Sequence, residues 1–399
     1  MNNRIKELSK LYFEEVQQIR HHLHRFPELS YNEVETSAFI ASKLEAWGIE
    51  YQRNVGGYNV VALLKGDLPA AAGRTIALRA DHDALPIVEQ GDKAYISQNK
   101  GIMHACGHDV HTASLLGCLR ILKELKSAWG GTVKAIFQHA EEVFPGGASQ
   151  MIEAGVLKNP DVEVIFGQHV FPDLEPGKVG FREGMYMASA DEIDLIIRGK
   201  GGHGATPHAC IDTILVASHV LVALQQVVSR RANPIIPTVL SFGSIQGGLA
   251  NNVIPEEVVI KGTFRTLDET WRKEAHQLIR EIAEGVAKSM GATAEVVIRV
   301  GYPCLINDSQ PTLLAQKTAK AYLGEANVVE LPIRMTSEDF SYYSQVAKSC
   351  FYRLGTGNKN NPATCHSVHT PLFDIDESAL ETGMGLLAAI AIRSLENED

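Results

Sequence analysis

Helix-like and strand-like apolar patterns alternate in the first part of the chain. Residues 4–25 have apolar positions at helical spacing and end before Pro27, so we expect a helix there. The strand expected at 74–80 leads into Asp81-His82-Asp83, and open α/β sheets place ligands at such strand ends. The other elements expected here are helices at 33–47 and 110–126 and strands at 58–65, 131–138 and 162–168. This order predicts an α/β domain with a mostly parallel sheet flanked by helices.

The order of the expected elements changes at about residue 187. Next come a strand at 190–199, a helix at 212–231, strands at 238–246 and 252–267, a helix at 268–290 and a strand at 293–301. This β-α-β-β-α-β order is typical of the ferredoxin-like arrangement. Helix and strand patterns then alternate again and end in an apolar helix at 377–395. We therefore expect an α/β domain formed by residues 1–186 and 304–399, with an inserted α+β domain at 187–303.

Composition places the chain among soluble globular proteins. Of its 399 residues, 45% are hydrophobic, and 37 Lys and Arg against 47 Asp and Glu give a formal net charge of −10. This acidic balance argues against nucleic-acid binding. The most apolar stretch, 211–228, is broken by polar residues and falls short of the roughly 18 apolar residues of a membrane span. The N-terminus has no signal-peptide pattern and the six cysteines are scattered, so we expect a cytoplasmic protein with reduced thiols.

Histidine is the residue whose distribution composition alone does not explain. The chain has 15, and three of them fall close to a cysteine and an aspartate, in the run that holds His104, Cys106, His108, Asp109 and His111. Further metal-capable residues follow predicted strands or lie near the C-terminus, namely Glu141, Glu142, His169 and His369. Thiolate, imidazole and carboxylate together suit zinc, manganese, nickel or cobalt. The sequence therefore predicts a metal site.

Spacing within this set limits how its side chains could bind an ion. Cys106 and His108 cannot share one face of a helix, but from a loop they could both turn toward one ion. Adjacent Glu141 and Glu142 point in different directions, so one could bind metal while the other faces a bound water. Each residue alone has an ordinary alternative, a hydrogen-bonded core histidine or a solvated glutamate pair. The recurrence of polar residues where buried strands end favours the metal site.

These motifs resemble those of a known family of metallo-amidohydrolases. The resemblance begins with Met103-His-Ala-Cys106-Gly-His108-Asp109, Glu141-Glu142 with Gly146-Gly147-Ala148, and Ile165-Phe-Gly-Gln-His169. It continues at residues 199–208, 252–255, 262–265, 337–340 and 369–373 and, with residues 23–29, covers nearly the whole chain in order. The family includes aminoacylases, hippurate hydrolases, N-acetyldiaminopimelate deacetylases and plant auxin–amino-acid conjugate hydrolases.

The resemblance implies a metal-binding α/β domain with an inserted domain that acts as a lid and commonly dimerises. It implies that one or two divalent ions are held by Cys106, His108, Glu142, His169 and His369. Glu141 would be the general base, and His203 would stabilise the oxyanion, often in the site of the partner subunit. Asn252 and Arg265 would bind the carboxylate of an amino acid, with a salt bridge on the strand face as the alternative for Arg265. The expected assembly is a homodimer or homotetramer.

One stretch departs from the wider superfamily, in which an early His-x-Asp motif supplies a metal ligand. The corresponding residues are Asp81-His82-Asp83, so that ligand is missing and the set containing Cys106 is expected to compensate. Asp83 is expected to serve catalysis by orienting a ligand, with a helix cap after the strand as the alternative. His82 stands where the subgroup typically has Met and is not expected to reach the metals.

The function expected from these features is metal-dependent hydrolysis of the amide bond of N-acyl amino acids, which are small-molecule substrates. Metal-activated water would attack the acyl carbonyl, with Glu141 accepting the proton. One alternative is a metallo-exopeptidase, a dipeptidase or carboxypeptidase, that uses the same site. Another is a metal-binding homologue without catalysis, against which Glu141 beside a full ligand set argues. The acyl group, the amino acid, the native metal and the number of ions stay open.

Overall fold

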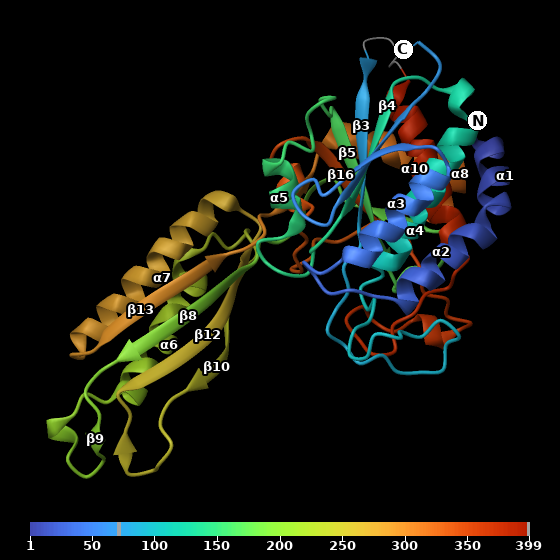
Figure 1. The fold of residues 1–399 in the computed structure, drawn as a ribbon. Helices are drawn as coiled ribbons and strands as arrows, with labels where there is room; N and C mark the ends of the chain where they lie inside the picture. The colour runs from blue at the N-terminus through green and yellow to red at the C-terminus, as the bar shows by residue number, and fades with distance from the viewer. Residues whose placement is uncertain (70–72, 397–399) are drawn as a thin grey trace. The chain divides into compact units, whose positions relative to one another are not determined.

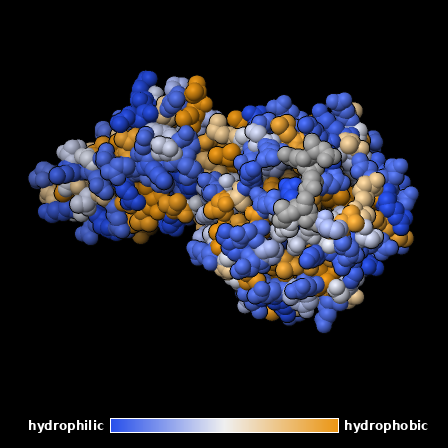
Figure 2. Space-filling model, turned by 90° about the horizontal axis from the view of Figure 1, so that it is seen from above, coloured by the Kyte–Doolittle hydropathy of each residue, from blue (hydrophilic) through white to orange (hydrophobic). Residues whose placement is uncertain are grey.

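The computed structural model describes residues 1–69 and 73–396, which form two compact units (Figure 1). The first unit contains residues 1–184, 306–333 and the chain from 339 onward, and the second contains residues 185–305 and 334–338. Each unit has its own sheet and its own hydrophobic core. On the face that Figure 2 shows, polar and apolar side chains are mixed over both units. The pattern of the sequence does not indicate that segment 334–338 joins the second unit.

A mixed eight-stranded sheet, in the order β1-β2-β4-β3-β5-β16-β6-β15, forms the centre of the first unit. Its four middle strands run parallel and are β4 (Thr132–Gln138), β3 (Thr75–Asp81), β5 (Val164–Phe171) and β16 (Lys348–Gly355). The outer strands are β1 (Glu50–Arg53), β2 (Val60–Lys65), β6 (Val179–Phe181) and β15 (Val328–Glu330). Strands β2 and β6 pair antiparallel with the parallel group, which makes the sheet mixed. Asp81 pairs with Gln138, so the carboxyl ends of β3 and β4 meet at one edge.

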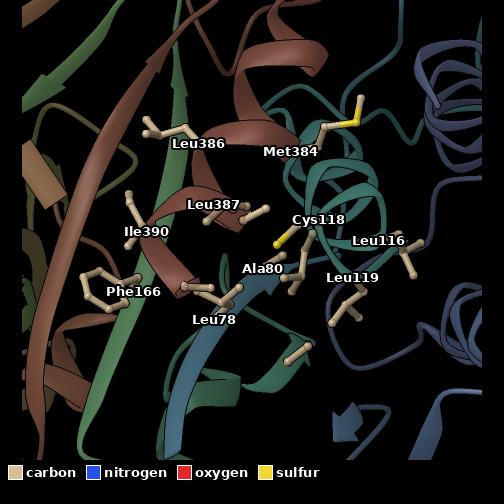
Figure 3. Close-up of a cluster of buried hydrophobic side chains, with 14 of the residues drawn as sticks. Leu78, Ala80, Leu116, Cys118, Leu119, Phe166, Met384, Leu386, Leu387 and Ile390 are labelled. Carbon is tan, nitrogen blue, oxygen red and sulfur yellow. The ribbon is translucent and has the colours of Figure 1, made fainter. Parts of the chain in front are cut away.

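Helices cover both faces of this sheet. On one face, Leu78 of β3 meets Cys118 of α4 (His108–Glu124) and Leu387 of α10 (Ala379–Leu395) in the main core (Figure 3). Around these two helices lie α1 (Asn2–Leu11), α2 (Phe13–Arg25), α3 (Val34–Ala46) and α8 (Ser309–Leu323). On the other face, Tyr343 of α9 (Ser341–Ser344) donates a hydrogen bond to Gln138 Oε1 and contacts Met151 of α5 (Gly147–Glu153). The predicted α/β fold with a helix-flanked sheet is confirmed.

Three elements differ from the expectation from sequence. The helix expected at 4–25 is divided at Tyr12, whose φ of −93° and ψ of 2° separate α1 from α2. The strand expected at 252–267 is divided into β11 (Val253–Ile254) and β12 (Glu257–Thr266), because Pro255 has no backbone N–H to continue the ladder. Strand β16 was not located by the pattern, although it completes the parallel group beside β5.

The second unit is a four-stranded antiparallel sheet, in the order β10-β12-β8-β13, packed against two helices. Its elements follow in the order β8 (Asp191–Arg198), α6 (Thr213–Gln226), β10 (Thr238–Gln246), β12, α7 (Glu269–Ser289) and β13 (Thr293–Val300). Ile193, Leu195 and Ile197 alternate along β8 and belong to the core shared with α6 and α7. Residues 213–231 form one continuous helix. By length and composition this helix could cross a membrane, but core helices of soluble proteins meet the same criteria. Its most apolar window is 33% buried.

A buried arginine joins the N-terminal helices to the start of α4. Arg20 of α2 donates to Asp109 Oδ2 at 3.1 Å, to Asp374 Oδ1 at 2.6 Å and to Glu377 Oε1 at 2.7 Å. Burial opposes the charge of Arg20, but Asp109 and Asp374 raise its pKa well above the usual value. Because Asp109 lies in the first turn of α4, this cluster fixes the helix end that carries the candidate ligand His108.

The Arg20 cluster yields the first testable prediction. Replacing Arg20 by Met keeps an unbranched side chain but leaves buried carboxylates without their cation, which costs about 3–5 kcal/mol. We expect Arg20→Met to lower the denaturant concentration at which the first unit unfolds. The matched control is Arg4→Met, since Arg4 forms only an exposed pair with Glu7 and should leave unfolding unchanged. Equal unfolding of Arg20→Met and the wild type would contradict this account of the cluster.

Candidate metal centre

Cys106 and His108 flank a glycine turn at the start of α4. Gly107 has φ +80°, and a Cβ at this position would lie 2.6 Å from Val170 Cγ2, so only glycine fits without a shift. The turn places Cys106 beside β5, with its Sγ 3.4 Å from Nε2 of His169. Cys106 therefore lies in a loop as expected, whereas His108 is the first residue of α4 rather than a loop residue.

The five candidate ligands come together at the carboxyl edge of the sheet. Cys106 Sγ lies 3.4 Å from His169 Nε2 and 3.3 Å from His369 Nε2. Glu142 Oε1 lies 3.3 Å from His369 Nε2 and 3.8 Å from His108 Nε2. Cys106, His108 and His169 are buried, whereas the His369 side chain is 51% exposed. The cluster combines one thiol, three imidazoles and one carboxylate within the reach of one or two ions.

Hydrogen bonds set the protonation of two of these histidines. In the neutral ring, His108 donates from Nδ1 to Asp83 Oδ1 at 3.1 Å, and His169 donates from Nδ1 to the carbonyl of Val170 at 2.8 Å. Each ring then presents the lone pair of Nε2 to the cluster. Nε2 of His108 and Oε1 of Glu142 are buried and form no hydrogen bond with the described residues. A divalent cation would satisfy both atoms, so the residues fit a metal.

Negative charge dominates the electrostatics of the cluster. Burial lowers the pKa of His108, but the charge of Asp81 and the hydrogen bond to Asp83 outweigh it and raise the pKa to about 10. Burial and the charge of Glu142 raise the pKa of the Cys106 thiol well above its usual value. A divalent cation favours the opposite forms, since it binds thiolate and neutral imidazole. The surrounding carboxylates would thus balance the charge of a bound cation.

Glu141 lies at the cluster but is oriented differently from Glu142. Its Oε1 accepts a hydrogen bond from the backbone N–H of Asp339 at 3.4 Å, and its Oε2 lies 3.9 Å from His108 Nε2. The residue is 6% exposed. This geometry provides a buried carboxylate that could accept a proton from a water held among the candidate ligands.

Asp83 supports the cluster from the end of β3. Its Oδ1 accepts the hydrogen bond from His108, and its Oδ2 accepts from Ser30 Oγ at 2.7 Å and from Glu142 N at 3.0 Å. Burial raises the pKa of Asp83, but the hydrogen bond and the charge of His108 outweigh it and hold the pKa at about 2. These contacts favour the orienting role over a helix cap, because they reach two candidate ligands.

A second line of buried polar residues, which sequence analysis missed, lies behind the cluster. Asp81 accepts from His111 Nδ1 at 2.6 Å and from Arg79 Nη1, and Arg79 Nη2 donates to Asp339 Oδ1 at 2.6 Å. His111 Nε2 accepts from Val170 N at 2.9 Å, so this ring is neutral with its proton on Nδ1. The sequence did indicate this network, since Arg79 is a charged residue in a strand that is buried along its whole length, where a charge requires a partner.

His82 lies outside the cluster. Neither of its ring nitrogens forms a hydrogen bond with the described residues, and burial lowers its pKa to about 3, so the ring is neutral. No group of described side chains that could share an ion includes His82.

The remaining predicted site residues belong to the second unit. His203 of β9 (Gly202–His203) is exposed, and its Nδ1 accepts a hydrogen bond from the N–H of Ala205 at 3.0 Å, which leaves the proton of a neutral ring on Nε2. Asn252 lies next to β11, the strand that pairs with β9. Arg265 of β12 donates to the carbonyl of Met335 at 3.1 Å and forms no ion pair with the described residues. The alternative salt bridge of Arg265 is therefore not seen in the described part of the chain.

Comparisons with known proteins identify the family of this chain. The profile of peptidase family M20/M25/M40 matches residues 77–393. An N-acyl-L-amino acid amidohydrolase of Geobacillus stearothermophilus is 45% identical over 289 residues, which cover 72% of this chain and 76% of the relative. Thermostable carboxypeptidase 1 of Saccharolobus solfataricus is 37% identical over 379 residues, 94% of each chain.

One solved structure adds information on metal binding within the family. The YXEP protein of Bacillus subtilis, described as a dinuclear metal binding peptidase from the M20 family, has a TM-score of 0.83 and 35% identity to this chain. The match covers 97% of this chain and 99% of that chain. With a family profile that spans most of its length and relatives aligned over nearly all of it, the chain belongs to peptidase family M20/M25/M40.

Proposed function

We propose that the protein hydrolyses the amide bond of N-acyl amino acids and releases a carboxylic acid and a free amino acid. The observation that carries this proposal is the buried carboxylate of Glu141 beside a group of possible metal ligands that includes His108 and Glu142. Nε2 of His108 and Oε1 of Glu142 form no hydrogen bond with the described residues. The relative named N-acyl-L-amino acid amidohydrolase supports the choice of substrate. Related members of the family carry names of hydrolases that act on amide bonds, and the protein is a hydrolase of this kind.

In this proposal the candidate ligands hold one or two divalent ions of zinc, manganese, nickel or cobalt. A bound ion supplies Lewis acidity and lowers the pKa of a bound water to about 7. Asp83 keeps His108 in the tautomer that presents Nε2 to the site. Glu141 accepts the proton of the attacking water and returns it to the leaving nitrogen. The description of the YXEP protein as dinuclear supports two ions rather than one.

We assign the oxyanion and carboxylate contacts of the reaction to the inserted domain expected at 187–303, which lies within the second unit and would act as a lid. His203 can donate from Nε2 to the oxyanion, since its Nδ1 already accepts a backbone hydrogen bond. Arg265 has no carboxylate partner among the described residues and could bind the substrate carboxylate in a bidentate manner, with Asn252 as a second donor.

A metallo-exopeptidase is the second candidate function. The 37% identical relative is named a carboxypeptidase, and an arginine available for a carboxylate would suit the C-terminus of a peptide equally well. The same candidate ligands and Glu141 would serve both reactions, so only the group on the acyl side of the bond distinguishes them.

We propose that the second unit also pairs with another copy of the chain, in a homodimer or homotetramer. Helix α6 exposes Ile214, Leu215 and Val222, the last at 75% of its surface, and apolar patches interrupt the polar surface of this unit (Figure 2). Strand β10 lies at an edge of its sheet and leaves backbone groups without a strand partner there. A two-fold pairing would cover both features at once.

Cytoplasmic localisation stays a prediction.

A substrate panel with Glu141→Gln as the matched variant tests the proposed reaction. The wild type, loaded in turn with manganese, zinc, nickel or cobalt, should hydrolyse N-acetyl and N-benzoyl amino acids with a higher kcat/KM than free dipeptides. Glu141→Gln should keep its metal but lose about 10²–10⁴-fold in kcat, because an amide cannot accept the proton. Faster hydrolysis of dipeptides would favour the exopeptidase. Normal turnover by Glu141→Gln would remove Glu141 from the role of base.

Metal content tests the ligand assignment independently of any substrate. Cys106→Ala removes the thiol that contacts both His169 and His369, so less metal per chain is expected by elemental analysis. Cys118→Ala is the matched control, because Cys118 is a buried core thiol of α4, the helix that follows Cys106, and its loss should leave the metal content unchanged. Full metal occupancy in Cys106→Ala would exclude Cys106 as a ligand.

The proposed assembly can be tested on α6. Val222→Glu places a charge at the most exposed apolar position named above and should shift the protein toward the monomer in sedimentation experiments. Val88→Glu, at a position of the first unit that is 68% exposed, is the control and should keep the wild-type assembly. A monomeric wild type, or an unchanged assembly of Val222→Glu, would contradict pairing through α6.

A further inference from the structure

Ala140, the residue immediately before Glu141, has an unusual backbone conformation. Its φ is +49°, in the left-handed region that costs a residue other than glycine about 1–3 kcal/mol. The residue is fully buried and lies two residues after the end of β4. Such a conformation persists only where the surrounding structure enforces it. The contacts of Ala140 show which groups do so.

Both the N–H and the carbonyl of Ala140 form hydrogen bonds. Its N–H donates to Oε1 of Glu33 at 2.8 Å, and its carbonyl accepts from the N–H of Gly147 at 2.9 Å. The N–H of His139 donates to Asn59 Oδ1 at 2.8 Å, so the segment is also fixed just before Ala140. Among these contacts, Glu33 provides the only side chain that holds Ala140 itself.

Glu33 is itself rigidly placed. It directly precedes α3, and its carbonyl accepts the hydrogen bond from Ser37 N at 3.1 Å that begins this helix. Its side chain is buried and forms no ion pair with the described residues. Burial and the charge of Asp83 raise its pKa to about 8. Both protonation states nevertheless leave an oxygen that can accept from Ala140.

Stability alone does not account for Glu33. A buried carboxyl group without a cation is costly, and an apolar residue would fill the same space at lower cost. The hydrogen bond to Ala140 acts one residue from Glu141 and two from Glu142, the carboxylates assigned to proton transfer and to metal. A displacement of about 1 Å in such a group can reduce a rate about 100-fold.

We propose that Glu33 is a positioning residue, which holds Ala140 in the left-handed conformation and thereby aims Glu141 at the reacting water. This inference rests on the proposed function, because it assigns Glu33 an effect on that reaction. Glu33 touches neither substrate nor metal in this account and acts only through the backbone of Ala140.

Four variants separate positioning from other roles. Glu33→Ala removes the acceptor and should lower kcat about 100-fold with little change in KM and unchanged metal content. Glu33→Gln keeps an acceptor oxygen at the same place and should restore most of kcat. Ala140→Gly in the Glu33→Ala background should recover part of kcat, since glycine adopts φ +49° without strain. Glu35→Ala, at an exposed glutamate of α3, is the matched control and should behave as the wild type.

The outcomes that overturn the inference are equally specific. Wild-type kcat in Glu33→Ala, equal loss in Glu33→Gln and Glu33→Ala, or no recovery with Ala140→Gly would each exclude positioning through this hydrogen bond. If Glu33→Ala does not fold, Glu33→Asp replaces it, because it withdraws the oxygen by one methylene group while keeping a carboxyl group.

A crystal structure of Glu33→Ala tests the positioning without any substrate. Ala140 should leave the left-handed region and the carboxylate of Glu141 should move, whereas an unchanged Ala140 would overturn the inference. A wild type that hydrolyses no amide with any of the four metals would contradict the proposed function alone, since this structural result does not depend on activity.

Discussion

The hydrogen bonds to the carboxylate of Asp83 are the interaction on which the rest of the site depends. This one buried group accepts from Ser30, from the ring of His108 and from the backbone of Glu142, and so joins three segments that are distant in sequence. His108 and its hydrogen bond hold the pKa of Asp83 at about 2 against the effect of burial, so the carboxylate stays charged at neutral pH. In the neutral ring of His108, the hydrogen bond to Asp83 keeps the proton on Nδ1 and leaves the lone pair of Nε2 for the cluster of candidate ligands.

Near Asp83, buried charged side chains of the first unit lie beside side chains of opposite charge. Arg79 and His111 donate hydrogen bonds to Asp81 behind the cluster. Arg20 forms ion pairs with carboxylates at the first turn of α4. Burying such groups is expensive unless every one is paired, and removal of one partner leaves the others unbalanced. The candidate ligands differ from these pairs, because Nε2 of His108 and Oε1 of Glu142 form no hydrogen bond with the described residues. This contrast distinguishes a structural charge network from a site that accepts a cation.

Much of this could be predicted from the sequence, for reasons that particular residues illustrate. The helix expected at 110–126 is α4 at 108–124, and the strand expected at 131–138 is β4 at 132–138, because local periodicity reports burial directly. Glu141, Glu142 and His169 could be grouped because parallel strands end at one edge. The role of Glu33 could not be predicted, since its partner Ala140 lies far away in sequence. Arg79 indicated that a buried charge needs a partner, but its partner Asp339 is 260 residues away and could not be identified. Strand β16 was not predicted for a similar reason, because it pairs with β5, a strand far away in sequence.

The most direct test of the central claim, that this edge of the sheet holds divalent ions, is anomalous X-ray diffraction from crystals grown with zinc. The account predicts one or two anomalous peaks within the cluster, with Cys106 Sγ at about 2.3 Å and histidine nitrogens at about 2.0–2.1 Å from an ion. Glu142 should complete the coordination, and Glu141 should lie beside the ion without being required to bind it. A crystal with zinc bound only elsewhere, or with Cys106 and His108 outside bonding distance of any ion, would contradict the account.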